Sequence, residues 1–407
     1  MSEKLKIAEP PFRHGQAFVL FSSGFRPFFL AAGILASLSV PLWLTMYYGL
    51  VVLPALDNPV AWHVHEMLFG YLGAALAGFL LTALPNWTGR APIVGAKLTG
   101  LFLLWLVGRL AMFIPASSTT SITLAILFPV ALTAVVWREV LACKNYRNLP
   151  VCVLISIFAL GQIVFWLGYE GTGPRLGFAA AATLLMLIGG RITPSFTRSW
   201  IDKLGKDGQP APFGVVDKVS LLAGVLAMAC WIVAPQQAAT GVIFAIAAGL
   251  NTLRLGRWCG HSTVSEPLLL ALHVGYGWLC VSFAIFSLSI LAPRLATEQQ
   301  ALHALGAGAI GQMTLVVMAR ASLGHTGRAL RSDVATALAF LLVFLGAVLR
   351  ISAGWFPQTP LVMQTSAVLW SGGFAIFVVR YFQDSRIGRA KVSTRSDFEG
   401  SRFGIVT

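Results

Sequence analysis

Long apolar stretches follow one another along most of this 407-residue chain, separated by short segments rich in proline, glycine or charge. A helix needs about 20 mostly apolar residues to cross a bilayer. The pattern therefore predicts an all-α polytopic membrane protein with about twelve transmembrane helices. They are expected at 28–48, 60–84, 97–115, 119–137, 150–169, 174–192, 215–234, 238–255, 266–292, 298–320, 333–351 and 361–382.

Two helix starts carry their own capping signals. Asn58 and Pro59 predict a cap and a first-turn proline for the second helix, and Thr297 to Gln300 reads as a capping box for the tenth. The predicted organisation is a cytoplasmic N-terminal segment (1–27), one twelve-helix transmembrane domain (28–382) and a basic cytoplasmic tail (383–407).

The composition excludes a soluble protein. Hydrophobic residues make up 57% of the chain and charged residues 11%, whereas soluble domains carry roughly 25% charged residues. Too few charges remain to solvate a water-facing surface, so the lipid bilayer is the predicted partner. The five cysteines include no C-x-x-C pair, which argues against structural zinc and thiolate chemistry.

Basic residues predict the orientation. Of 29 Lys and Arg, 25 fall in the N-terminal tail, the C-terminal tail and alternate connecting segments, among them 254–257. The opposite connections hold only Arg175 and Arg294. Because Lys and Arg concentrate in cytoplasmic loops, both termini are predicted to be cytoplasmic. This topology accounts for the net charge of +14, and no nucleic-acid partner is expected.

An internal repeat accompanies this pattern. His65 to Arg90 and His303 to Arg328 align without gaps, sharing the first histidine, two glycines and a closing Thr-Gly-Arg. A weaker echo around Arg191 places a third copy in the sixth helix. Helices two, six and ten are four apart, which suggests three blocks of four helices.

Four histidines fall inside predicted helices: His63, His65, His273 and His303. Ionisable groups at membrane depth are expensive and usually functional, and imidazole is the commonest protein ligand of haem iron and copper. All four are therefore candidate metal ligands, and helix–helix hydrogen bonding is the ordinary alternative.

Helical geometry limits which histidines can act together. His63 and His65 diverge by ~200° on a helix, so they cannot face one metal. His65 is expected to face His303, its repeat partner. His273 lies ~15 Å from His303 in depth at 1.5 Å per residue and is expected to belong to another site.

Three further residues are candidates near the outer end of the helices. Glu66 could orient a ligand imidazole or accept protons. Arg109 and Arg350 could hold haem propionates with bidentate hydrogen bonds, or could extend to the outer interface as ordinary snorkelling arginines.

Several motifs resemble the NnrS family, in order and over essentially all twelve helices. They are Gly24–Phe29 (GFRPFF), His63–Tyr71 (HVHEMLFGY), Gly78–Thr82 (GFLLT), Asn86–Arg90 (NWTGR), Leu104–Arg109 (LWLVGR), Gly189–Arg191 (GGR), His273–Tyr276 (HVGY) and Met318–Arg328 (MARASLGHTGR). The resemblance implies a bacterial inner-membrane protein containing haem, of b type, and copper, linked to denitrification and nitric oxide tolerance. Twelve helices with a threefold arrangement are also distantly similar to the haem–copper oxidases, an analogy of architecture only.

The leading functional hypothesis is a haem and copper protein that binds nitric oxide and turns it over as an oxidoreductase, with an electron donor that the sequence does not identify. A second hypothesis is a twelve-helix transporter of copper or a metal–nitrosyl species. A third is a haem-binding sensor or assembly factor. The presence of a haem absorption spectrum separates the first hypothesis from an ordinary transporter.

Overall fold

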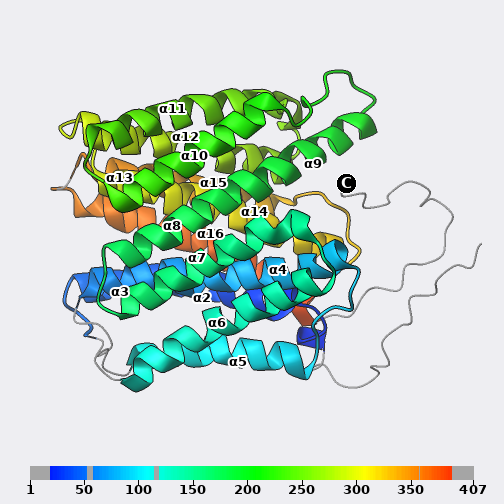
Figure 1. Ribbon diagram of the computed structural model, residues 1–407, viewed down its shortest axis with the longest axis horizontal. Helices are drawn as coiled ribbons and strands as arrows, with labels where there is room; N and C mark the ends of the chain where they lie inside the picture. The colour runs from blue at the N-terminus through cyan, green and yellow to red at the C-terminus, as the bar shows by residue number, and fades with distance from the viewer. Residues whose placement is uncertain (1–18, 53–57, 114–118, 357, 387–407) are drawn as a thin grey trace, which may run out of the picture.

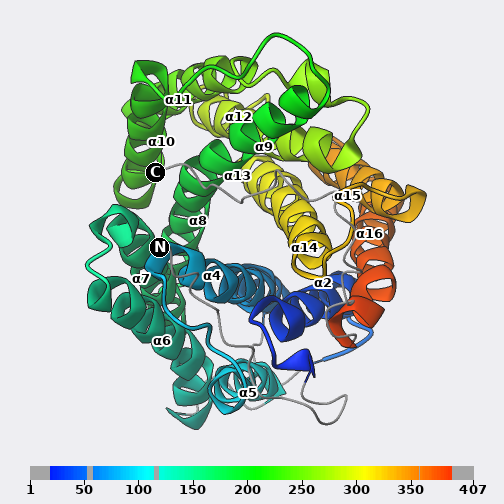
Figure 2. The same cartoon turned by 90° about the vertical axis from the view of Figure 1, so that its right-hand side faces the viewer.

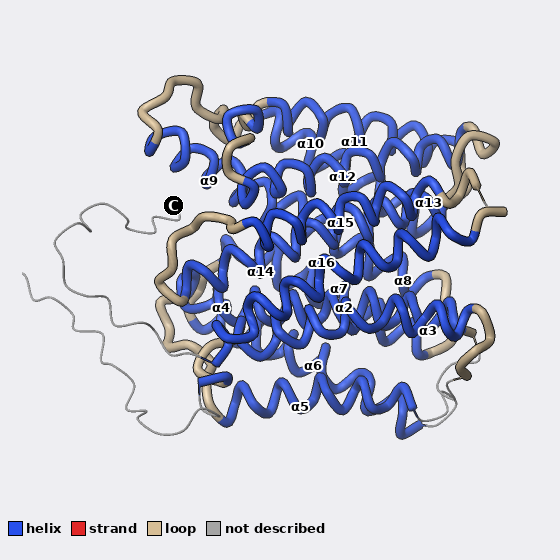
Figure 3. The backbone as a smooth tube through the Cα atoms, turned by 180° about the vertical axis from the view of Figure 1, so that it is seen from behind, coloured by secondary structure: helices blue, strands red, loops and turns tan. Residues whose placement is uncertain are grey.

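The computed structural model describes residues 19–52, 58–113, 119–356 and 358–386, and every regular element within them is helical (Figures 1 and 3). Most of the predicted N-terminal segment (1–27) and the predicted basic tail beyond Arg386 lie outside the described residues.

Eleven of the described helices are long and apolar enough to cross a membrane. The remaining predicted span, the third (97–115), corresponds to a shorter helix, Ala96–Leu110, followed by a 3₁₀ turn, Ala111–Phe113. In chain order the elements are α2 (Phe25–Tyr47), α3 (Pro59–His65), η1 (Glu66–Tyr71), α4 (Leu72–Thr88), α5 (Ala96–Leu110), η2 (Ala111–Phe113), α6 (Thr119–Ala142), η3 (Tyr146–Asn148), α7 (Leu149–Trp166), α8 (Thr172–Leu184), η4 (Leu185–Gly189), α9 (Gly190–Lys203), α10 (Val215–Val233), α11 (Ala238–Gly256), η5 (Gly260–Thr263), α12 (Pro267–Leu291), α13 (Glu298–His303), η6 (Ala304–Ile310), α14 (Gly311–His325), α15 (Val334–Ser352) and α16 (Pro360–Arg386).

The predicted spans agree with these helices, which confirms the fold class. The Asn58 side chain accepts a hydrogen bond from the Val60 amide at 2.9 Å, and Thr297 and Gln300 form the expected reciprocal capping box. The largest difference is α9, which carries the sixth helix on to Lys203, beyond the predicted end at 192. Charged residues mark where apolar sequence stops, but they do not stop a helix.

Three helices occupy the middle of the bundle. They are the composite second, sixth and tenth helices, α3–η1–α4, α8–η4–α9 and α13–η6–α14, of 30, 32 and 28 residues. Viewed along the helices, α4, α8 and α14 lie inside a ring formed by the remaining ones (Figure 2), and the three inner helices contact one another. Each block of four consecutive helices thus contributes one inner helix.

Each inner helix contains a π-helical turn: η1, η4 and η6. The turns η1 and η6 begin immediately after the two aligned histidines, at Glu66 and Ala304. A π-helical turn widens the i→i−4 hydrogen-bond ladder locally and often marks a functional site.

A side chain from the same block donates a hydrogen bond to one carbonyl of each π-helical turn. Trp105 Nε1 donates to the Gly70 oxygen at 3.0 Å, Arg254 Nη1 to the Met186 oxygen at 2.9 Å, and Trp370 Nε1 to the Ala307 oxygen at 3.1 Å. The three four-helix blocks therefore share the same arrangement, a π-helical turn with a side-chain hydrogen bond to one of its carbonyls, which supports the threefold repeat.

Candidate functional site

Two histidines from different inner helices lie side by side near one end of the bundle. His63 is in the first turns of the second helix and His303 is in the first turns of the tenth. Their ring centroids are 6.5 Å apart and their planes differ by 17°. The loops at this end are those with few basic residues. Of the four candidate histidines, these two are the ones that the fold brings together.

The His303 ring is oriented by its own helix. Its Nδ1 lies 2.7 Å from the Gln299 carbonyl oxygen, one turn earlier. Because a carbonyl oxygen can only accept, Nδ1 carries the proton and Nε2 keeps its lone pair. A hydrogen bond of this kind from the distal ring nitrogen is typical of a metal-binding histidine.

His63 has a shielded nitrogen without a partner: its Nδ1 makes no hydrogen bond within the described part of the chain. The Trp43 ring packs on the His63 ring with centroids 4.5 Å apart, and the indole nitrogens of Trp43 and Trp62 are also buried without partners. Unsatisfied buried polar groups are rare in native proteins and indicate an absent water, ion or ligand.

Arg350 completes this group, near the end of α15. Its guanidinium acts electrostatically on both imidazoles and on Tyr47. No carboxylate or carbonyl within the described ranges pairs with it. We call Trp43, Tyr47, His63, His303 and Arg350 the histidine cluster. It combines two imidazoles with a partly buried positive charge that has no counter-ion, so it suits an anionic ligand able to accept imidazole ligation.

The expectation that His65 faces His303 is wrong. His65 is fully buried, and both ring nitrogens are engaged elsewhere. Nδ1 donates to Glu66 Oε1 at 3.0 Å, and Nε2 accepts from Trp166 Nε1 at 3.0 Å. Positions 63 and 65 do point in different directions, as helical geometry requires, but His63 is the residue that points toward the tenth helix. Equivalent positions in two helices of a rotational repeat face their own neighbours, not each other.

Glu66 accepts the hydrogen bond of its sequence neighbour His65, and its role in orienting a ligand imidazole stays a prediction. Arg109 Nη1 donates to the same Glu66 oxygen at 2.6 Å, so Arg109, Glu66, His65 and Trp166 form a continuous buried network. This network distinguishes the two candidate arginines. Arg109 already has a carboxylate partner inside the protein, whereas Arg350 has none in the described structure.

His273 lies apart from the histidine cluster, two turns into α12. Its Nδ1 donates to the Leu269 carbonyl at 3.0 Å, its Nε2 lies 3.4 Å from Thr197 Oγ1, and its ring packs against Trp258. No three His, Cys, Asp or Glu residues gather as a metal site in the described ranges. The candidate ligands therefore occupy three separate places.

Sequence reasoning missed a second buried polar network. Arg254 is 0% exposed inside α11, although the segment 254–257 reads as a cytoplasmic loop. Its Nε donates to Asp217 Oδ1 at 2.9 Å, and its Nη1 also donates to the Tyr276 hydroxyl at 2.9 Å. Gly190 makes room, because a Cβ there would lie 2.2 Å from Arg254 Nη2. In the sequence, an arginine near a helix end looks the same whether its side chain is buried in an ion pair or lies in a cytoplasmic loop.

These features define the class of the protein. It is a polytopic α-helical membrane protein in which three inner helices, each with a π-helical turn, organise the bundle, and two of them bring histidines together.

The family model of the NnrS protein matches residues 19–383 of this chain. The chain therefore belongs to the NnrS family, as its motifs indicate. No match was found among the curated proteins.

Proposed function

We propose that this NnrS family member is a haem protein of the bacterial inner membrane, with both termini cytoplasmic, that binds nitric oxide and protects the cell from it. The single observation that carries the proposal is the histidine cluster: His63 and His303 lie side by side, close to the guanidinium of Arg350, for which the described residues supply no counter-ion. The family name fits a function related to nitric oxide.

The residues of the cluster fit haem in three respects. His303 offers the lone pair of Nε2, because its Nδ1 proton is held by Gln299. His63 offers a nitrogen that has no partner in the described structure. Arg350 offers a bidentate donor for a propionate, and the indole nitrogen of Trp43, which has no partner in the described structure, is a further donor for a carboxylate oxygen.

Copper fits the same cluster less well. Two imidazoles can ligate copper, but the positive charge of Arg350 opposes a bare cation and favours a group that brings its own carboxylates. Copper binding stays a prediction for this chain, and His273 and His65 stay candidate ligands for it.

Bound haem would supply an iron that takes up nitric oxide and exchanges electrons with an external donor. The protein's own residues would hold and shield it. His63 and His303 would hold the iron, Arg350 would neutralise the carboxylates, and the Trp43 ring covers the His63 imidazole. Nitric oxide is small and uncharged, so it can reach this depth through the lipid without a polar channel.

The transporter hypothesis gains no comparable support. Transporters are built from inverted or parallel repeats, so the common direction of the second, sixth and tenth helices is compatible with transport but identifies no substrate. A haem-binding sensor would use the same cluster and would differ only in passing a signal to a partner once nitric oxide is bound.

A graded series at Arg350 tests the propionate contact. Lys keeps the charge without the planar fork and Gln removes both, so we expect haem affinity to fall about tenfold in Arg350→Lys and about a hundredfold in Arg350→Gln, since a charge-assisted hydrogen bond is worth ~1.5–3 kcal/mol. Transfer of haem to an apo-globin acceptor measures the loss. Arg294→Gln is the control, because Arg294 is an exposed arginine at the same end. Equal transfer rates in all four proteins would contradict the assignment.

A further inference from the structure

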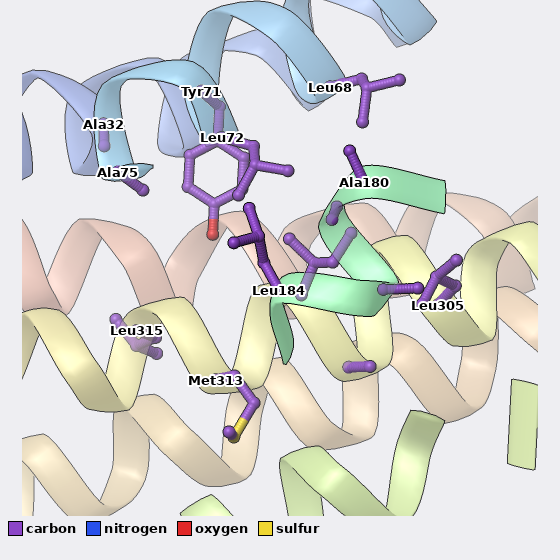
Figure 4. Close-up of a cluster of buried hydrophobic side chains, with 14 of the residues drawn as sticks. Ala32, Leu68, Tyr71, Leu72, Ala75, Ala180, Leu184, Leu305, Met313 and Leu315 are labelled. Atoms are coloured by element: carbon purple, nitrogen blue, oxygen red, sulfur yellow. The ribbon is translucent and has the colours of Figure 1, made fainter. Parts of the chain in front are cut away.

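An apolar cavity of about 70 Å³ lies where the three inner helices meet. Its walls come from α4, from α8, η4 and α9, and from η6 and α14, and Phe29 of α2 closes one side. Figure 4 shows part of this region, with the Leu72 side chain of α4 next to that of Leu184 of α8, and with Met313 on the neighbouring α14. Two of the three π-helical turns, η4 and η6, contribute residues to it.

The chemistry of the wall is almost uniform. Thr314 carries the one hydroxyl among the lining side chains, and that hydroxyl is already engaged. It donates to the Ile310 carbonyl at 2.6 Å and also contacts the Tyr71 hydroxyl. A buried water needs two to four polar partners, and apolar cavities without them stay dry. Water is therefore a poor occupant.

The size of the cavity restricts what can enter. A single water takes ~30 Å³ in the liquid, and a dry apolar cavity of ~150 Å³ admits benzene. A volume of about 70 Å³ thus accommodates a diatomic molecule or a xenon atom and is too small for an aromatic ring.

The cavity is close to the histidine cluster. Ile310 follows His303 by seven residues and Leu72 follows His63 by nine, so at 1.5 Å per residue the cavity lies ~10–13 Å deeper along both helices. The same two helices line both places.

We propose that this cavity is a binding site for small, uncharged, apolar molecules, the chemical class to which nitric oxide and dioxygen belong. Dispersion contacts with the apolar walls and the absence of competing water would hold the ligand. The site goes beyond the proposed function and does not rest on it, because neither haem nor copper takes part in it.

Xenon is the probe, used on crystals of the full chain under gas pressure. We expect one xenon atom between Ala181 and Met313 in the wild type. In Ala181→Leu the added side chain fills the space from α8, and we expect the xenon occupancy to fall at least tenfold. Ala75→Leu fills the cavity from α4. It takes the place of Ala181→Leu in the experiment if that variant does not fold. Thr314→Val, which removes the hydroxyl at constant shape, should keep the xenon.

The matched control is Ala134→Leu, the same change at an exposed position of α6, and it should bind xenon like the wild type. A well-folded wild type without xenon in the cavity, or with a lipid chain occupying it, would overturn the proposal. So would equal xenon occupancy in Ala181→Leu and Ala134→Leu. A protein with a normal haem spectrum but no xenon in the cavity would contradict the cavity site and leave the proposed haem function untouched.

Discussion

Replacing either His63 or His303 by alanine should lower the haem content of the purified protein at least about tenfold, while the protein still inserts and folds. The two rings lie 6.5 Å apart on two different helices, so both would hold the proposed haem, and losing a ligand worth more than ~1.4 kcal/mol weakens binding by at least that factor. Both side chains are only partly buried and join no ion pair in the described structure, so truncation leaves little buried polarity behind. The haem-to-protein ratio measures the effect.

His65→Gln is the matched control for these two variants. Its ring is enclosed by Glu66 and Trp166 and not by His303, so we expect its haem content to match that of the wild type. The His65→Gln substitution should instead lower the free energy of unfolding, since a buried donor or acceptor left unsatisfied costs ~1–3 kcal/mol. Normal haem in His63→Ala, together with its loss in His65→Gln and His303→Ala, would return the site to His65 and His303, the pair that the repeat alone suggests.

Arg254→Leu should destabilise the folded protein by ~3–5 kcal/mol. The guanidinium is 0% exposed and joins Asp217 on α10, Met186 on η4 and Tyr276 on α12. Leucine would leave the Asp217 carboxylate with a much weaker counter-ion in a buried place, and removing one partner of a buried ion pair costs this much. Equilibrium unfolding in mixed micelles, followed by helix content, measures the difference.

Arg257→Leu is the comparison for that experiment. Arg257 pairs with the same aspartate at 3.2 Å, but its side chain is 28% exposed, so its removal should cost under ~1 kcal/mol. Equal destabilisation by the two variants would contradict this prediction. It would mean that the buried Arg254 stabilises the fold no more than the partly exposed Arg257, and that the hydrogen bond from Arg254 to η4 adds nothing.

Much of the fold could be predicted because the bilayer imposes simple rules on the sequence. Apolar length gives the helices, and local capping chemistry at Asn58 and Thr297 gives two of their starts. The repeat could be inferred as well, because His65 to Arg90 and His303 to Arg328 align without gaps, and in the structure both histidines directly precede π-helical turns. The π-helical turns themselves could not be predicted, because the Trp and Arg side chains that bond to their carbonyls come from helices far away in the sequence.

The candidate site was only partly predictable. Depth along a helix follows from residue number, so the grouping of His63, His303 and Arg350 at one end could be anticipated. The direction in which a side chain points depends on how two helices are rotated against each other, and that choice separates His63 from His65. Arg254 shows the same limit, because Lys and Arg counts assign a side of the membrane but cannot tell an exposed guanidinium from one that turns inward to Asp217.

The most direct test of the proposed function is the absorption spectrum of the purified wild-type protein, recorded reduced, before and after addition of nitric oxide. We predict a Soret band with resolved bands in the visible region, as for a protein with bound b-type haem, and a shift of the Soret band when nitric oxide is added. A protein that is folded and pure but shows no Soret band, or one whose haem spectrum does not respond to nitric oxide, would contradict the account.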